Sequence, residues 1–274
     1  MFAPRLAMTL VNRRGPAAPF LHEGDFCLGI ARARSFGYDC VEIHARAPEE
    51  LDTRRLADAL AREGIAVSAL GTGRAYVDDG LSLIDPDPIA RGEAMRRLLG
   101  FIDTAAELGA LVIVGCLRGN IAPPGQKEEG LLRLGDAMRR ADACAAERGV
   151  RLALEAINRY ENNYLCSVYD AAAFIEENGL LATGILADTF HMNIEERDIA
   201  QALRDNARRI VYVHAADSNR RYPGGGHTDF HAVARALAET GYGGDIGAEC
   251  LPLPGDAEAA ALWLQNMKGY LSRI

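Results

Sequence analysis

The sequence predicts a closed (β/α)8 barrel, the TIM-barrel architecture, with residues 1–274 in a single domain. Three observations favour this fold. Short apolar segments of β type alternate along the chain with longer segments of helical period, and eight such pairs follow one another. Alternation of this kind indicates a parallel sheet, and eight units favour a closed barrel over an open sheet. The length also suits one barrel domain, which commonly has about 250 residues.

The expected strands are short apolar runs that stop at a polar residue or a glycine. Their content of Val, Ile and Leu is typical of parallel strands that are buried on both faces. The last four of them end in a carboxylate or an imidazole. We expect strands at residues 6–11, 40–44, 65–70, 111–114, 152–155, 185–188, 211–214 and 245–249.

The expected helices are indicated by apolar stripes and by end signals. Asp52 or Thr53 can cap the helix at residues 54–63, and Gly64 stands where a left-handed residue ends it. Other helices also stop at a glycine, and the polar stretch 71–90 is expected to be a long loop. Helices are expected at residues 24–36, 54–63, 95–108, 128–148, 168–177, 195–207 and 229–240, followed by a last helix that Asp256 can cap and that reaches Tyr270.

The composition favours a protein that acts on small molecules. The formal net charge is −8 and no cluster of lysines or arginines stands out, which argues against binding to nucleic acid or to anionic membranes. Residues 1–20 hold no apolar segment of signal-peptide length, and no run of about 18 apolar residues occurs. The six cysteines are scattered without a Cys-x-x-Cys pair, as in a reduced protein. We therefore expect a cytoplasmic protein.

Four consecutive strands end in side chains that can bind a metal: Glu155, Asp188, His214 and Glu249. The intervals between them are 33, 26 and 35 residues, each the length of one βα unit. Because the C-terminal ends of barrel strands converge on one face, these side chains can reach one cation. One such residue alone is more often a helix cap or an ion-pair partner, but four together predict a metal site.

Three carboxylates and one imidazole suit a hard or borderline divalent ion. Mn²⁺, Mg²⁺ and Co²⁺ fit best, and Zn²⁺ is less favoured without thiolate ligands. Such an ion can act as a Lewis acid and stabilise the enediolate that forms when a sugar loses the proton next to its carbonyl group. Two glutamates on either side of that carbon can remove the proton and return it to the opposite face.

Three segments resemble the ketose 3-epimerases of the D-tagatose and D-psicose type, which belong to the xylose isomerase-like superfamily. They are residues 155–161, 188–196 and 213–224, within a likeness that extends from about residue 80 onward. The resemblance implies a homodimer or homotetramer acting on a sugar. It also implies that the four strand-end residues bind the metal, that Glu155 and Glu249 transfer the proton, and that Glu161, His191 and Arg220 hold the oxygens of C1 to C3.

The residues themselves leave simpler interpretations open. Glu161 could merely pair with Arg159, His191 could be a helix-terminal residue bonded to Asp188, and Arg220 could be a solvated loop charge. On this barrel face a guanidinium beside His214 is also well placed to stabilise a developing oxyanion.

Arginines in other loops distinguish this chain from simple ketose epimerases. Arg74, Arg118 and Arg221 could bind a phosphate or carboxylate, which would make the substrate an anionic sugar derivative, or they could be ordinary paired or solvated arginines. The glycine-rich residues 224–229 could be a phosphate-binding nest or a turn before the next helix.

Two other activities fit the same scaffold. An inosose-dehydratase-like lyase would use the same metal and base to expel a hydroxyl group as water. A DNA repair nuclease like endonuclease IV shares the barrel and an Asp-x-x-His motif, but it needs histidines where Leu70 and Cys116 stand, and the acidic charge opposes DNA binding.

Overall fold

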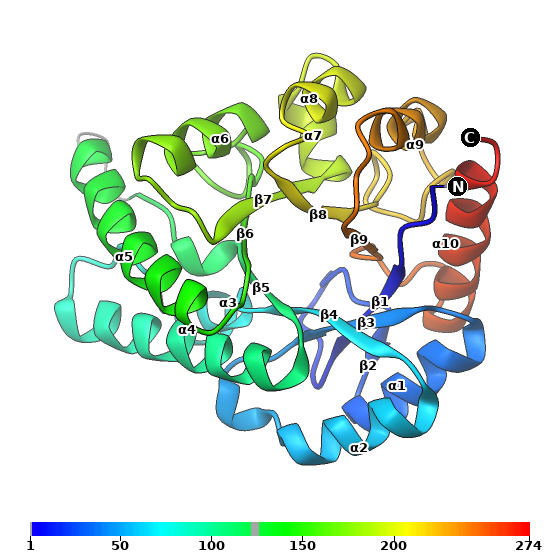
Figure 1. Ribbon diagram of the computed structural model, residues 1–274, viewed down its shortest axis with the longest axis horizontal. Helices are drawn as coiled ribbons and strands as arrows, with labels where there is room; N and C mark the ends of the chain where they lie inside the picture. Colours follow the sequence, from blue (N-terminus) through cyan, green and yellow to red (C-terminus); the bar gives the residue numbers. More distant parts are fainter. Residues whose placement is uncertain (1, 122–125) are drawn as a thin grey trace.

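The computed structural model describes residues 2–121 and 126–274 as a parallel barrel surrounded by helices (Figure 1). Within these residues eight strands close the barrel in the order β1-β3-β4-β5-β6-β7-β8-β9, and β9 pairs with β1. The (β/α)8 barrel expected from the sequence is therefore confirmed. The barrel strands are β1 (Leu6–Val11), β3 (Cys40–His44), β4 (Ala66–Gly71), β5 (Leu111–Val114), β6 (Leu152–Glu155), β7 (Thr183–Asp188), β8 (Ile210–His214) and β9 (Asp245–Gly247).

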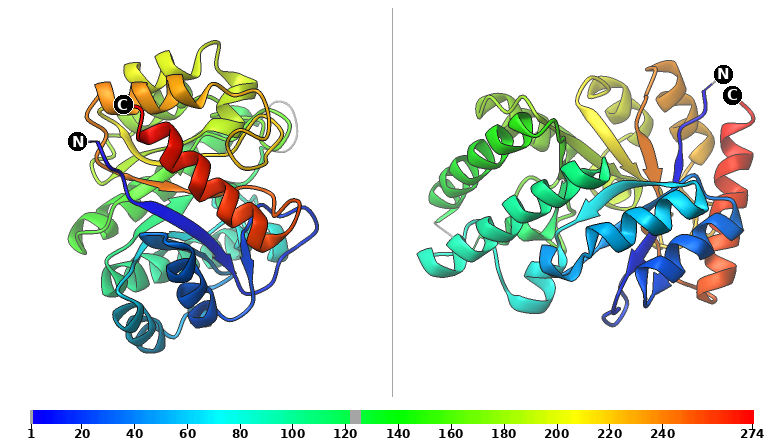
Figure 2. Two further views of the ribbon diagram at one scale, coloured as in Figure 1. Left: turned by 90° about the vertical axis from the view of Figure 1, so that its right-hand side faces the viewer. Right: turned by 60° about the horizontal axis from the view of Figure 1, so that its bottom comes forward.

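The helices lie outside the barrel, as the two views in Figure 2 show. Helix α2 is typical, because it buries Leu56, Ala59 and Leu60 on one side and leaves charged residues on the other. The helices are α1 (Phe26–Phe36), α2 (Thr53–Glu63), α3 (Arg74–Asp79), α4 (Pro88–Leu108), α5 (Lys127–Glu147), α6 (Val168–Glu177), α7 (Thr189–Glu195), α8 (Ile199–Asp205), α9 (Phe230–Glu239) and α10 (Asp256–Leu271), with 3₁₀ turns η1 (Pro48–Glu50) and η2 (Cys116–Arg118).

The helix ends follow the local signals in the sequence. Asp52 caps α2, and its side chain accepts a hydrogen bond from the backbone N–H of Arg55. Gly64 ends the helix with a φ of 66°, a left-handed conformation that costs glycine little. Ser167 and Asp170 form a reciprocal capping box at the start of α6.

Three parts of the chain differ from the expectation. The stretch 71–90 is not all loop, because it contains α3. The helix expected at 195–207 is shorter, α8 at Ile199–Asp205, and a further helix, α7, precedes it. Asp188 caps α7 by accepting from the N–H of Phe190. Asp256 is the first residue of α10 rather than its cap, and its carboxylate accepts two hydrogen bonds from Arg14. A two-residue strand, β2 (His22–Glu23), also pairs with β1.

The barrel closes between the first and last strands. Leu6 pairs with Ile246 and Ala7 pairs with Gly247. One residue after β9, the carbonyl of Ala248 accepts a hydrogen bond from the Thr9 hydroxyl of β1 at 2.9 Å, which extends the seam by one residue. The two chain ends consequently lie near each other in every view (Figures 1 and 2).

The interior of the barrel contains an apolar layer made by one residue from each of five neighbouring strands. Strand side chains alternate between the two faces of a sheet, so the residues two positions further along form the next layer towards the C-terminal ends. On β6, β7 and β8 these next residues are Glu155, Asp188 and His214. The apolar layer consists of Ala69, Ile113, Ala153, Leu186 and Tyr212.

No helix in the described part of the chain is both long enough and apolar enough to cross a membrane.

All six cysteines are free thiols, as expected from their spacing. Cys40 and Cys250 are fully buried, and the other four are partly buried.

Candidate functional site

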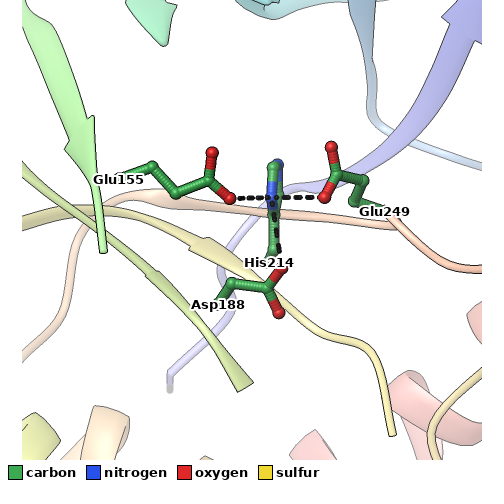
Figure 3. Close-up of side chains that lie close together, drawn as sticks. All are labelled: Glu155, Asp188, His214 and Glu249. Carbon is green, nitrogen blue, oxygen red and sulfur yellow. Dashed lines mark ion pairs between the residues drawn. The ribbon is translucent and has the colours of Figure 1, made fainter. Parts of the chain in front are cut away.

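Four side chains from the last four strands converge inside the mouth of the barrel (Figure 3). Glu155, Asp188 and His214 are the last residues of their strands, and Glu249 follows β9 by two residues. One ligand atom from each lies within 4.8 Å of the others, and all four residues are buried. The sequence therefore predicted correctly which residues meet.

The imidazole of His214 is the centre of this cluster. Its Nδ1 lies 3.5 Å from Oε2 of Glu249 and 4.0 Å from Oε1 of Glu155. The distance from Nδ1 to Oδ2 of Asp188 is also 4.0 Å. Figure 3 shows the Glu155 and Glu249 carboxylates on opposite sides of the imidazole, facing each other.

Parallel pairing and two glycines make room for the cluster. Asp188 is paired in register with His214, so their side chains leave neighbouring strands at the same level. At Gly115 an added Cβ would lie 2.1 Å from Oε2 of Glu155, which leaves no space for a larger residue. At Gly247 it would lie 2.9 Å from Cδ2 of His214.

Two buried atoms of the cluster are evidence that it can bind a cation. Among the described residues, Nδ1 of His214 and Oδ2 of Asp188 have no hydrogen-bond partner. A buried polar atom without a partner costs about 1–3 kcal/mol, so such atoms usually mark a bound group. Both are ligand atoms of the kind that bind divalent metals, and they point to the same place.

The electrostatics of the cluster agree with this interpretation. Burial raises the pKa of Glu155 well above its usual value, and the charge of Glu249 raises it further. Burial likewise raises the pKa of Asp188, to about 7. Burial alone would lower the pKa of His214, but Glu42 and Glu249 raise it to about 10. These shifts favour the protonated form of each group, and a divalent cation bound here would displace those protons.

Sequence reasoning missed Glu42, which lies in the middle of β3 and is completely buried. Both of its oxygens lie 3.0 Å from Nε2 of His214. Burial would raise the pKa of Glu42, but His214 and His44 hold it well below the usual range. The available signal was a charged residue inside an otherwise apolar strand, followed two positions later by His44 on the same face.

His191 lies at the edge of the cluster, on α7. Its Nδ1 accepts a hydrogen bond from the side-chain amide of Asn158 at 2.6 Å. Its Nε2 lies 3.7 Å from Glu155 and from Asp188. Burial, followed by the charge of Arg220, lowers the pKa of His191 well below its usual value. The ring is therefore neutral, and this network assigns its proton to Nε2, on the side of the metal cluster.

Glu161 and Arg220 form an ion pair above the cluster. Nη1 of Arg220 donates to Oε1 of Glu161 at 2.9 Å, and its Nη2 lies 3.3 Å from Oε2 of Glu249. The guanidinium also covers the ring of Phe190 at 4.7 Å. The alternative pairing of Glu161 with Arg159 is not formed, because Arg159 binds Glu195 at 2.7 Å.

Arg118 does not reach the site, contrary to the expectation that it contacts the substrate. It is completely buried, and its Nη1 donates to Oδ1 of Asn162 and to the carbonyl of Tyr164. Its Nη2 donates to the carbonyl of Leu165 at 3.3 Å. The guanidinium thus holds the loop between β6 and α6 against η2.

Replacing Arg118 by leucine should therefore destabilise the fold and should not select between substrates. We expect the free energy of unfolding to fall by about 3 kcal/mol or more, because buried oxygens lose their donors. Denaturant unfolding measures this loss. The exposed Arg221 supplies the control, since Arg221→Leu should change stability by less than about 0.5 kcal/mol. A variant with normal stability and a raised KM only for phosphorylated sugars would restore Arg118 as a substrate contact.

Two other features proposed for anion binding, Arg74 and the glycine-rich loop, are also occupied by the protein. Arg74 donates to Asp78 at 2.9 Å and to Asn12. The glycine-rich loop is a turn around a buried carboxylate rather than an open nest. In it, Asp217 accepts from the N–H of Gly224 at 2.8 Å and of Thr228 at 2.9 Å.

A cavity of about 340 Å³ leads to the cluster. Glu155 and Glu249 line it together with Glu161 and Arg220, and residues 15–20 form another part of its wall. The volume is suitable for one small molecule.

Comparisons with known proteins agree with this geometry. Residues 30–267 match the family model described as xylose isomerase-like TIM barrel. A ketose 3-epimerase from Arthrobacter globiformis is 35% identical over 221 residues, which cover 79% of this chain and 74% of that protein. An L-ribulose 3-epimerase from Mesorhizobium japonicum is 33% identical over 222 residues, which cover 80% of this chain and 73% of that protein.

A solved structure of an L-ribulose 3-epimerase has a TM-score of 0.83 and 26% sequence identity, and it covers 99% of this chain and 95% of its own. The resemblance to ketose 3-epimerases expected from the sequence is therefore confirmed.

Proposed function

Because the chain belongs to the xylose isomerase-like TIM barrel family, we propose that it is a divalent-metal-dependent ketose 3-epimerase. The observation that carries this proposal is the placement of the Glu155 and Glu249 carboxylates on opposite sides of the cluster, both in the lining of the cavity (Figure 3). Two carboxylates that face each other can exchange protons with opposite faces of one sugar carbon.

In the proposed reaction, one of these glutamates removes the proton from the carbon next to the carbonyl group. The other then gives a proton to the opposite face, which inverts the configuration at that carbon. Burial raises the pKa of Glu155, and a carboxylate with a raised pKa is a stronger base than an ordinary one.

Glu155, Asp188, His214 and Glu249 would hold the cation. When bound, a divalent metal supplies Lewis-acid stabilisation of the negative charge that develops on the sugar oxygens. The oxygen-rich ligand set favours Mn²⁺, Mg²⁺ or Co²⁺.

Glu161, His191 and Arg220 would hold the sugar oxygens on the cavity side of the cluster. His191 can donate from Nε2, and the cationic Arg220 can stabilise an oxygen that gains negative charge. Its ion pair with Glu161 and its contact with Phe190 keep the guanidinium in place for this.

The charges along the cavity favour a neutral sugar over the anionic derivative considered from the sequence. Arg74 and Arg220 are the two arginines among its described lining residues, and each is paired with carboxylates. The lining also includes four carboxylates: Asp78, Glu155, Glu161 and Glu249. Neither Arg118 nor Arg221 is among the described lining residues, so the cavity offers a phosphate group no arginine that is free of a carboxylate partner.

A lyase would need the same metal and base, so exchange and product analysis must separate it from an epimerase. A nuclease has less support, because the strands that end at Gly71 and Val114 bring no histidine to the cluster and acidic residues dominate the cavity.

Deuterium incorporation from D₂O tests the proposal. The Mn²⁺-loaded protein is incubated with a panel of free and phosphorylated ketoses, and the label is located by NMR. We expect deuterium at C3 of a neutral ketose together with its C3 epimer.

Each other result has a distinct meaning. Label at C1 with an aldose product would indicate an aldose–ketose isomerase. Loss of water would indicate the lyase, and preferential use of a phosphorylated ketose would contradict the neutral substrate. Absence of exchange across the whole panel would refute the epimerase.

A further inference from the structure

We propose that Glu42 is a positioning residue for the metal centre, which fixes the orientation and the tautomer of His214 so that its Nδ1 lone pair faces the three carboxylates. The inference rests on the metal site of the proposed function, and it does not depend on which sugar is bound.

Glu42 is a buried carboxylate whose hydrogen-bond partners are imidazoles and a tyrosine hydroxyl. Its side chain is fully inaccessible, and in the described parts of the chain no lysine or arginine forms an ion pair with it. Instead, Nε2 of His214 lies 3.0 Å from both oxygens, and the hydroxyl of Tyr212 donates to Oε2 at 2.8 Å. A carboxylate is costly to bury, so a specific role for these contacts is expected.

The geometry of the imidazole follows from this contact. A carboxylate can only accept, so Glu42 keeps a proton on Nε2 of His214, and Nδ1 is the nitrogen that would offer its lone pair to a bound metal. The two nitrogens lie on opposite sides of the ring, and Nδ1 is the atom found 3.5 Å from Glu249 and without a partner among the described residues. The opposite tautomer would direct an N–H group into the cluster and prevent metal binding.

The surrounding barrel interior is built to hold Glu42 in this position. At Gly247 an added Cβ would lie 2.5 Å from Oε2 of Glu42, so only glycine leaves room for the carboxylate. Below it, the hydroxyl of Ser68 lies 2.8 Å from the Tyr212 hydroxyl and 3.0 Å from the carbonyl of Val41, and its single proton can be donated to either of them. This column of hydrogen bonds connects the middle of the barrel to the metal ligand.

The same carboxylate also holds a residue of the cavity wall. Nε2 of His44 lies 2.5 Å from Oε1 of Glu42, and His44 lines the cavity. An added Cβ at Gly71 would lie 2.2 Å from Nδ1 of His44, so this ring, too, occupies space that a glycine provides. Glu42 thus positions two imidazoles, one facing the cluster and one facing the substrate cavity.

Metal affinity of the whole chain, measured without any sugar, tests the proposal. Mn²⁺ binding to the wild type and to Glu42→Gln is measured by competition with a chelator, and unfolding is followed in parallel. Removal of an outer partner of a ligating histidine typically costs 10–100-fold in metal affinity, and we expect a loss of about that size. The control is Glu258→Gln, the same change at an exposed residue of α10, which should leave the affinity within about threefold.

A second measurement separates positioning from general destabilisation. In the Mg²⁺-loaded wild type, the Nε2 proton of His214 should give a downfield NMR signal because of its bond to the carboxylate. It should move upfield or disappear by exchange in Glu42→Gln. If that variant does not fold, Glu42→Asp, which keeps the charge but withdraws it by one methylene, should show a smaller loss of affinity.

Three results would overturn the proposal. They are an affinity of Glu42→Gln within twofold of the wild type, an unchanged His214 signal, and a loss of metal affinity equally large in Glu258→Gln. A wild type that binds no divalent metal would refute the metal site itself, whereas failure of the sugar assay alone would leave the metal measurements valid.

Discussion

Replacing Glu249 by glutamine should lower the rate of epimerisation by at least about 100-fold, because an amide cannot take up the proton that the proposed reaction moves. Glu155→Gln should have an equally large effect. The two variants should differ in exchange: each glutamate serves one face of the sugar carbon, so each variant should lose exchange from one epimer and keep part of the exchange from the other.

The measurement is deuterium exchange from each purified epimer at saturating Mn²⁺, since both residues are also proposed metal ligands. Glu258→Gln, an exposed change on α10, is the control and should be fully active. Retention of more than about a tenth of the epimerisation rate by Glu249→Gln, with metal bound, would contradict its role as a base.

Removal of the divalent metal should abolish activity, and the stabilisation caused by added Mn²⁺ should grow with pH. Burial raises the pKa of Asp188 to about 7 and that of Glu155 well above its usual value. Such groups contribute stability to the metal-free fold below about pH 4, which is lost as pH rises through about 7. The raised pKa of His214, about 10, continues the trend in the same direction. A cation replaces these protons, so it should stabilise the fold most where they have left.

Thermal unfolding of the chelator-treated protein, with and without Mn²⁺, measures this effect between pH 5 and pH 8. At 100 times the dissociation constant, binding adds about 2.7 kcal/mol, or roughly 5–10 °C in Tm for a chain of this size. We expect less than half of this shift at pH 5. A shift independent of pH, or full activity in excess chelator, would place the metal away from this cluster.

The sequence predicted the barrel and the convergence of four side chains at its mouth, because both depend on local order along the chain. A carboxylate or imidazole at the end of an apolar run must lie at the C-terminal mouth of a parallel barrel, whatever the details of packing. Glu155, Asp188 and His214 were found in this way.

Contacts between distant loops could not be predicted in the same way. Arg118 follows the end of β5, where an arginine that contacts the substrate and one that only holds the backbone look alike in the sequence. Which one it is depends on neighbours far along the chain, such as Tyr164. Glu42 was missed for the opposite reason: it lies within an apolar strand, and its partner His214 is 172 residues away.

Because the barrel closes between β1 and β9, catalysis requires the first and the last strand to be paired. β9 has three residues, and the backbone N–H of Ala248, immediately before Glu249, donates to the carbonyl of Ala7 at 2.9 Å. One of the two proposed bases is therefore held by the opening strand of the polypeptide. During synthesis on the ribosome, the chain would be inactive until its final βα unit docks. A protease that cleaves the first strand would inactivate the enzyme although it cleaves at none of the proposed metal ligands.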